Sequence, residues 1–229
     1  MPAAADFLAF LREAAAPLFR RRMLVPVLAL VALLTFTNIV IARNLPPPDG
    51  PLSPPFLAAA LVRIGGLVVL AVAITRILAA SPRSPWRPDG AFWLALLAII
   101  LSFAVTESIE IGVGVRSYPA GLLISSALSA LIVAPFSPWL VAIAAEKPLA
   151  WSPLPWLRRF GRWLPQLVVW FLLLVTPPAY LHATINTAVV EGRIDRFWLA
   201  MLFDGPLSAG IALFGLALNN AAYWRVARS

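Results

Sequence analysis

The residues of this sequence that could do chemistry are ionisable side chains inside long apolar runs. Arg63 lies within the run at 56–80, and Glu107 and Glu110 lie near the end of the run at 91–113. The two glutamates are three residues apart, so they share one face of a helix. An ionisable group within a membrane is costly unless it is paired, which makes each of these residues a functional candidate.

Three further polar residues lie near the ends of other apolar runs. With the orientation argued below, all of these groups fall in the outer third of a bilayer, whereas the inner two-thirds is nearly free of charge. The sequence therefore predicts one intramembrane polar cluster, which comprises Asn38, Arg63, Glu107, Glu110, His182 and Asp204.

The predicted cluster has two interpretations. In the first, Arg63 pairs with Glu107 or Glu110 beside His182, and the group forms a pocket for a lipid headgroup or a small anionic solute. In the second, the same ion pair only locks helix packing, which is preferred because it satisfies the charges without a substrate. Asp204-Gly205-Pro206 also has the composition of a helix start, which would leave Asp204 in water.

Composition indicates the elements that must position these residues. Of 229 residues, 61% are hydrophobic and 12% are charged, and the mean hydropathy is +0.88. A soluble domain carries about 25% charged residues. The fold class expected is all-α, a polytopic transmembrane helical bundle of about six spans in one domain at 23–229. Each expected span is close to the roughly 20 residues that cross a bilayer. The spans lie near 23–42, 56–80, 91–113, 119–143, 164–184 and 199–223.

Residues 1–22 precede the first expected span. Apolar residues between Phe7 and Phe19 recur with helical spacing, and Arg20, Arg21 and Arg22 follow them. This pattern predicts a short N-terminal amphipathic helix in the membrane interface, with its arginines at the headgroups. The alternative is a cytoplasmic extension of the first span.

The distribution of basic residues predicts the orientation. Thirteen Lys and Arg residues fall in segments on the side of the N-terminus, against four on the other side. Cytoplasmic segments carry the excess of Lys and Arg. The expected topology is therefore N-in/C-in, as a multi-pass protein of a bacterial inner (cytoplasmic) membrane. The Trp- and Arg-rich loop 146–163 is expected along the cytoplasmic face.

The stretch from Leu131 to Trp170 carries a resemblance. An apolar span ends in Ala144-Ala145-Glu146-Lys147, an amphipathic stretch from Trp156 to Trp163 leads into the next span, and the last span ends in Ala222-Tyr223-Trp224-Arg225. This part, about the last hundred residues, resembles small bacterial six-span proteins related to the membrane domain of glycerophosphodiester phosphodiesterases. The sequence departs from that pattern in one respect, since it shows no clear form of the small polar residue and the Thr/Ser-x-Gly step that are usual before the fifth span. The resemblance implies a membrane domain with no chemistry of its own.

The expected function is that of a non-enzymatic subunit or scaffold of an inner-membrane complex. The sequence has no cysteine and one histidine, which excludes disulfides, thiolate chemistry and a multi-histidine metal site. It contains no nucleotide-binding or nucleophile motif, so we expect no enzyme, no cofactor and no nucleic-acid partner. Expected partners are membrane lipids and another membrane protein. The alternative is a small transporter or lipid-handling protein that uses the outer polar cluster. An intramembrane enzyme using His182 and the two glutamates is the third candidate.

Overall fold

The computed structural model describes residues 2–46, 50–113, 134–146, 150–160 and 164–228, together with residues 124, 128, 131 and 132. Within these residues the regular elements are all α-helices or short 3-10 helices, which confirms the all-α fold class. This agrees with the apolar periodicity of the sequence, because a helix satisfies its backbone hydrogen bonds within one segment, as hydrocarbon requires.

Four helices are long and apolar enough to cross a membrane, at Arg21–Arg43, Pro54–Leu78, Pro165–Val189 and Phe197–Ala227. They correspond to the first, second, fifth and sixth expected spans. The third expected span corresponds to α4 (Gly90–Val113), of which Gly90–Ser102 forms a shorter apolar helix. The first part of the fourth expected span, 119–133, lies mostly outside the described residues, whereas 134–143 is described.

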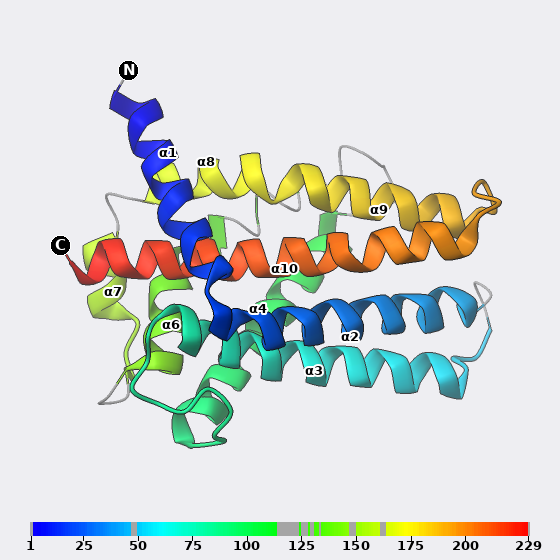
Figure 1. Cartoon of the computed structure of the whole chain (residues 1–229), viewed down its shortest axis with the longest axis horizontal. Helices are drawn as coiled ribbons and strands as arrows, with labels where there is room; N and C mark the ends of the chain where they lie inside the picture. The colour runs from blue at the N-terminus through cyan, green and yellow to red at the C-terminus, as the bar shows by residue number, and fades with distance from the viewer. Residues whose placement is uncertain are drawn as a thin grey trace.

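The long helices form two antiparallel hairpins whose turns lie at one end of the bundle (Figure 1). The helices α2 (Leu24–Arg43) and α3 (Pro54–Leu78) form the first hairpin, and α9 (Thr176–Val190) and α10 (Phe197–Ala227) form the second. We call this end the hairpin end. Both chain termini lie at the opposite end, which we call the termini end. Ser53 caps the start of α3 by accepting a hydrogen bond from the backbone N–H of Phe56.

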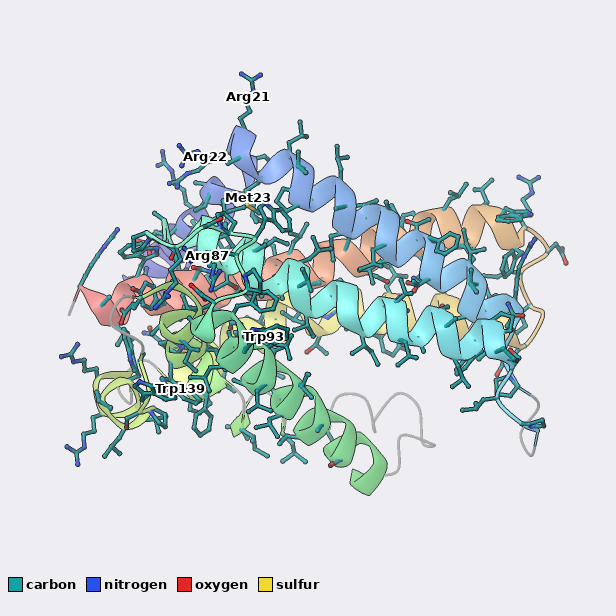
Figure 2. The ribbon with its side chains drawn as sticks, turned by 90° about the horizontal axis from the view of Figure 1, so that it is seen from below. Arg21, Arg22, Met23, Arg87, Trp93 and Trp139 are labelled. Carbon is teal, nitrogen blue, oxygen red and sulfur yellow. The ribbon has the colours of Figure 1, made fainter. Side chains whose placement is uncertain are left out.

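The amphipathic N-terminal segment forms α1 (Pro2–Ala15), and two 3-10 turns, Ala16–Phe19 and Arg21–Met23, separate it from α2. It is therefore a separate helix and not an extension of the first span. Its apolar face packs against protein, since Phe10 and Ala14 are buried and the Phe10 ring lies 4.1 Å from that of Trp170. Figure 2 shows Arg21 and Arg22 reaching out from the bundle at the termini end.

The described end of the fourth expected span is a short helix. A 3-10 turn at Ala134–Phe136 precedes α6 (Ser137–Ala145), which has a proline in its first turn. Pro135 and Pro138 lie at this change from 3-10 turn to α-helix, which fits the backbone donor that each proline removes. In the expected loop 146–163, residues Leu154–Phe160 form α7. Trp156 stacks on Tyr223 at 5.4 Å, whereas Trp151 is exposed.

The fifth span is broken near its middle. The helix α8 (Leu164–Leu174) ends one residue before α9 begins, and Pro177 and Pro178 lie in the first turn of α9. The prolines follow this interruption and do not end the span. The helix continues to Val190, six residues beyond the expected end at 184, because the first turn of a helix needs no internal donors.

The helix of the sixth span begins before Asp204, whereas one interpretation of the sequence placed a helix start at Asp204-Gly205-Pro206. The helix α10 runs from Phe197 and contains Pro206 in its interior, so Asp204 is not at a helix start. Asp204 is fully buried within the bundle. The interpretation that placed this carboxylate in water is therefore wrong, because neighbouring helices supply the partners that water would have supplied.

A network of hydrogen bonds with an ion pair lies at the termini end of the bundle. The side chain of Arg76, on α3, is fully buried and donates to the carbonyl oxygens of Ala144, Ser84 and Arg87 and to the Asp89 carboxylate. We call this group the Arg76 network. It joins the end of α3, the start of α4 and the end of α6.

Asp89 is held in its charged form by the Arg76 network. Partial burial acts to raise the pKa of its carboxyl group. The hydrogen bonds from the Phe92 backbone N–H, Arg76 and Arg83 outweigh that effect and lower the pKa to about 2. The network is thus fully charged at neutral pH.

Candidate functional site

The candidate site begins with a close approach of α2 and α10. A Cβ atom added at Gly205 would lie 2.6 Å from the Cα atom of Thr35, so only glycine allows the two backbones to come this near. Asp204 and Ser208 are four residues apart on α10 and share one face. The close approach brings that face against Asn38 of α2.

Asp204 is the centre of a hydrogen-bonded group. The Asn38 side-chain nitrogen donates to Asp204 Oδ2 at 2.7 Å and lies 3.3 Å from Ser208 Oγ. His182 Nδ1 lies 2.6 Å from Asp204 Oδ1, and the Asp204 side chain is 0% exposed. The carboxylate is therefore bonded on both oxygens, as a buried charge requires.

Arg63 joins this group through an amide. Its guanidinium donates to Asn38 Oδ1, and the nitrogen of the same amide donates to Asp204. Asn38 therefore bridges a cation on α3 and an anion on α10. We call Asn38, Arg63, His182, Asp204 and Ser208 the Asp204 network.

His182 follows the interruption in the fifth span. It lies on α9 with Asn186 one turn further along, and the Asn186 side-chain nitrogen is 3.2 Å from His182 Nε2. A ring that carries its proton on Nδ1 donates to Asp204 and accepts from Asn186 at Nε2. The Asn186 nitrogen also lies 3.2 Å from Nδ1, so the donor and acceptor roles around the ring depend on its tautomer.

The serine, histidine and aspartate do not form the geometry of a hydrolase triad. In a triad, histidine uses one ring nitrogen for the carboxylate and the other for the nucleophile. Here Ser208 Oγ lies 3.1 Å from His182 Nδ1, the same nitrogen that contacts Asp204. The arrangement is suited to holding charge and protons rather than to activating Ser208.

A cavity with a volume of about 420 Å³ opens beside the Asp204 network. Arg63, His182 and Ser208 line it, and so do apolar side chains of α2, α3, α4, α6 and α10: Leu30, Leu34, Leu67, Ala71, Ile99, Leu140, Ile211, Ala212 and Leu216. The volume is in the range of small-molecule sites, which are mostly apolar with a few placed polar groups. The cavity is thus amphipathic, with one charged region and a long apolar wall.

The cavity extends along α10 away from the charged region. Asn219, which also lines it, is eleven residues beyond Ser208, or about 16 Å along a helix. The Asn219 side-chain oxygen is buried and has no hydrogen-bond partner among the described residues. Asn220 donates to Leu216 of its own helix. No hydrogen bond from either residue to another helix is found among the described contacts.

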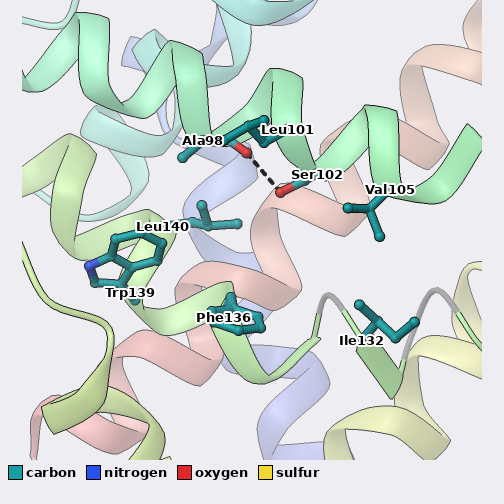
Figure 3. A pocket seen from close by; sticks show the side chains of 8 residues that line it. All are labelled: Ala98, Leu101, Ser102, Val105, Ile132, Phe136, Trp139 and Leu140. Atoms are coloured by element: carbon teal, nitrogen blue, oxygen red, sulfur yellow. Dashed lines mark hydrogen bonds between the residues drawn. The ribbon is translucent and has the colours of Figure 1, made fainter. Parts of the chain in front are cut away.

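A second pocket of about 180 Å³ lies between α4 and the start of α6 (Figure 3). Its described lining is apolar apart from Ser102, whose hydroxyl donates to the Ala98 carbonyl oxygen at 2.8 Å. Ser102 and Leu140 line both cavities, so the two lie next to each other. This pocket offers shape and apolar surface rather than charge.

Four of the six residues predicted for the polar cluster meet in the Asp204 network: Asn38, Arg63, His182 and Asp204. The side chains of Glu107 and Glu110 lie outside the described residues, and so does the ion pair expected between one of them and Arg63. Ser208 was not predicted. Its spacing of four residues from Asp204 would have indicated it, once α10 was recognised as one continuous helix.

Comparison of the chain with protein-family models, with curated proteins and with solved structures gives no match. The site therefore has to be interpreted from its own geometry.

Proposed function

We propose that this chain is a small transporter or lipid-handling protein that binds an amphiphile with an anionic head. One observation carries the proposal: Arg63, His182 and Ser208 line part of an otherwise mostly apolar cavity inside the membrane-spanning bundle. Arg63 supplies a permanent positive charge with several donors. The apolar wall would hold a hydrocarbon chain, and the cavity volume fits one chain better than a two-chain lipid.

The proposal includes a topology. Six spans with both termini in the cytoplasm of an inner membrane are supported by the arginines at the termini end, where Arg12, Arg20, Arg21, Arg22, Arg83, Arg87, Arg158, Arg159, Arg225 and Arg228 gather. The hairpin end carries Arg43, Arg193 and Arg196. As a third span, α4 is long enough, at 24 residues or about 36 Å. On this orientation the Asp204 network lies in the outer part of the bilayer.

The experiment is equilibrium binding of radiolabelled decanesulfonate to the protein in nanodiscs of zwitterionic lipid, with empty nanodiscs as the blank. We expect saturable binding that Arg63→Gln weakens about 10- to 100-fold, since a hydrogen bond to a charged group contributes about 1.5–3 kcal/mol. The matched control is Arg43→Gln. Arg43 lies outside the cavity, with its guanidinium 4.0 Å from the centre of the Trp198 ring, and its substitution should leave binding unchanged.

The possible results of this binding experiment have different meanings for the proposed function. Binding that does not saturate, or that Arg63→Gln leaves intact in a folded protein, contradicts the proposal. Equal binding of 1-decanol and decanesulfonate would show that the apolar wall alone is used.

The subunit or scaffold function is the second candidate. It is favoured by the exposed side chains of Trp151 and Leu154, which lie beside the exposed Arg158 and Arg159 on the termini end. Tryptophan and arginine are enriched in protein interfaces. A pulldown in mild detergent tests it: a stoichiometric partner lost on Trp151→Ala would favour a subunit, and a chain that purifies alone would count against it.

A further inference from the structure

His182 stands at the boundary between the Asp204 network and the cavity. Its ring contacts the buried Asp204 carboxylate and also lines the cavity. It is the only histidine in the chain. Histidine is the side chain whose ordinary charge change falls near physiological pH, so it is suited to taking up a proton in response to its surroundings.

The charges around this ring balance without a ligand. The described elements packed there present one cation, Arg63 of α3, and one anion, Asp204 of α10, while α2 presents the neutral Asn38. When the His182 ring is neutral, the charge of Arg63 is balanced by that of Asp204. The described group therefore has no net charge, which is the favourable state within a membrane.

An anionic ligand would disturb this balance. Bound beside Arg63, it adds one negative charge to a site that was neutral, and burying an uncompensated charge is costly. A proton added to His182 Nε2 restores neutrality. The resulting imidazolium keeps its Nδ1–H bond to Asp204, and the Asn186 amide can turn its oxygen toward Nε2.

We propose that one proton binds His182 with each anionic ligand, so that the cavity takes up the anion and the proton together as a neutral pair. This inference rests on the proposed function, because it requires an anion at Arg63. It adds a second ligand, the proton, and a coupling between the two. A protein that moved its ligand in this way would use a proton gradient to do so.

The coupling has a definite sign. Linked binding is reciprocal, so an anion that favours the protonated ring must itself bind more tightly as the pH falls. Decanesulfonate is a suitable probe because a sulfonate stays charged over the whole range. We expect its affinity to fall about tenfold per pH unit across the range in which the ligand-free ring is neutral and the bound ring is protonated. Proton uptake in weakly buffered nanodiscs should approach one per anion bound.

The single histidine makes the same test possible by NMR. With ¹⁵N-labelled histidine the protein gives one pair of ring signals, and adding decanesulfonate should shift their titration midpoint to higher pH. The uncharged 1-decanol should leave the midpoint unchanged. His182→Gln should bind decanesulfonate with an affinity that no longer depends on pH.

Failure of the coupling and failure of the proposed function give different results. Saturable, Arg63-dependent binding that is independent of pH in the wild type overturns the proton coupling and leaves the proposed function standing. Absence of saturable decanesulfonate binding at every pH from about 5 to about 8 overturns both.

Discussion

The helix α3 carries two arginines, thirteen residues apart, whose surroundings differ in a way that separates structure from function. Arg76, at the termini end, donates from Nε and from both terminal nitrogens to three backbone carbonyls and a carboxylate. Arg63, nearer the hairpin end, donates to one amide among the described residues and faces a cavity. Both are arginines within an apolar helix, yet only one has its geometry fully determined by protein.

The difference between Arg76 and Arg63 shows how an arginine that stabilises helix packing can be distinguished from one that belongs to a binding site. An arginine that only stabilises packing uses all of its guanidinium nitrogens in hydrogen bonds to protein and is fully buried, as Arg76 is. A site places its charge at the wall of a cavity and connects it to groups that can change protonation, as the Asp204 network does. The preference for a packing lock at Arg63, drawn from the sequence, describes Arg76 better.

The largest effect should come from breaking the Arg76 network. Arg76→Met leaves three backbone carbonyls without this donor and removes one of the three donors to Asp89, so we expect a loss of about 3–5 kcal/mol in stability. Thermal unfolding in detergent measures it. Decanesulfonate binding of the protein that remains folded should be unchanged, and a substitution that lowered binding but not stability would reverse the roles given to the two arginines.

A smaller effect is expected at the close approach of α2 and α10. Gly205→Ala places a Cβ against the backbone of Thr35, which no side-chain rotation relieves, and should cost about 1–3 kcal/mol. It should also weaken decanesulfonate binding, because it separates Asn38 from Asp204. Gly210→Ala is the matched control, since a Cβ there meets nothing within 4 Å. Equal effects of the two substitutions would contradict the packing described for Gly205.

The stability that the Arg76 network contributes should depend on pH through Asp89. The lowered pKa of its carboxyl means that its contribution to stability is complete above about pH 4 and is lost as the pH falls through about 2. That contribution is on the order of 2 kcal/mol. Melting temperatures of the wild type should therefore fall more steeply over this range than those of Asp89→Asn. Parallel curves would show that the Arg76 network does not hold this carboxylate.

The smallest effect is expected from Arg63→Lys. Lysine keeps the charge and can supply the one hydrogen bond to Asn38, so the loss of stability should be below about 1 kcal/mol. Arg76→Lys, measured in parallel, should lose more, because three donors on one nitrogen cannot reach the same four acceptors. Equal losses would mean that both arginines act as locks.

The sequence predicted those parts of this molecule that depend on local pattern. The all-α fold and the separate N-terminal amphipathic helix follow from apolar spacing. The meeting of Asn38, Arg63, His182 and Asp204 followed from their shared depth alone, which is a strong constraint in a membrane because polar groups must find each other there.

What the sequence could not predict depends on contacts between distant residues. Asp204-Gly205-Pro206 has the local composition of a helix start, and only the packing of α2 against Gly205 makes it the interior of a helix. The Arg76 network escaped prediction for a related reason. Its acceptors are mostly backbone carbonyls, which every residue has, so no residue type in the sequence indicates them.

The docking of α1 has a consequence for the order in which this chain matures. The N-terminal helix is made first, but the groups that cover it are made late: Trp170 packs on Phe10, and Arg225 pairs with Asp6 and Glu13. Until the ribosome has made both Trp170 and Arg225, α1 lacks one or both of these partners, and the membrane interface can host its apolar face. Docking of α1 onto the end of the last span therefore has to wait for α10. A chain truncated before Arg225 would lose the ion pairs that hold α1 there.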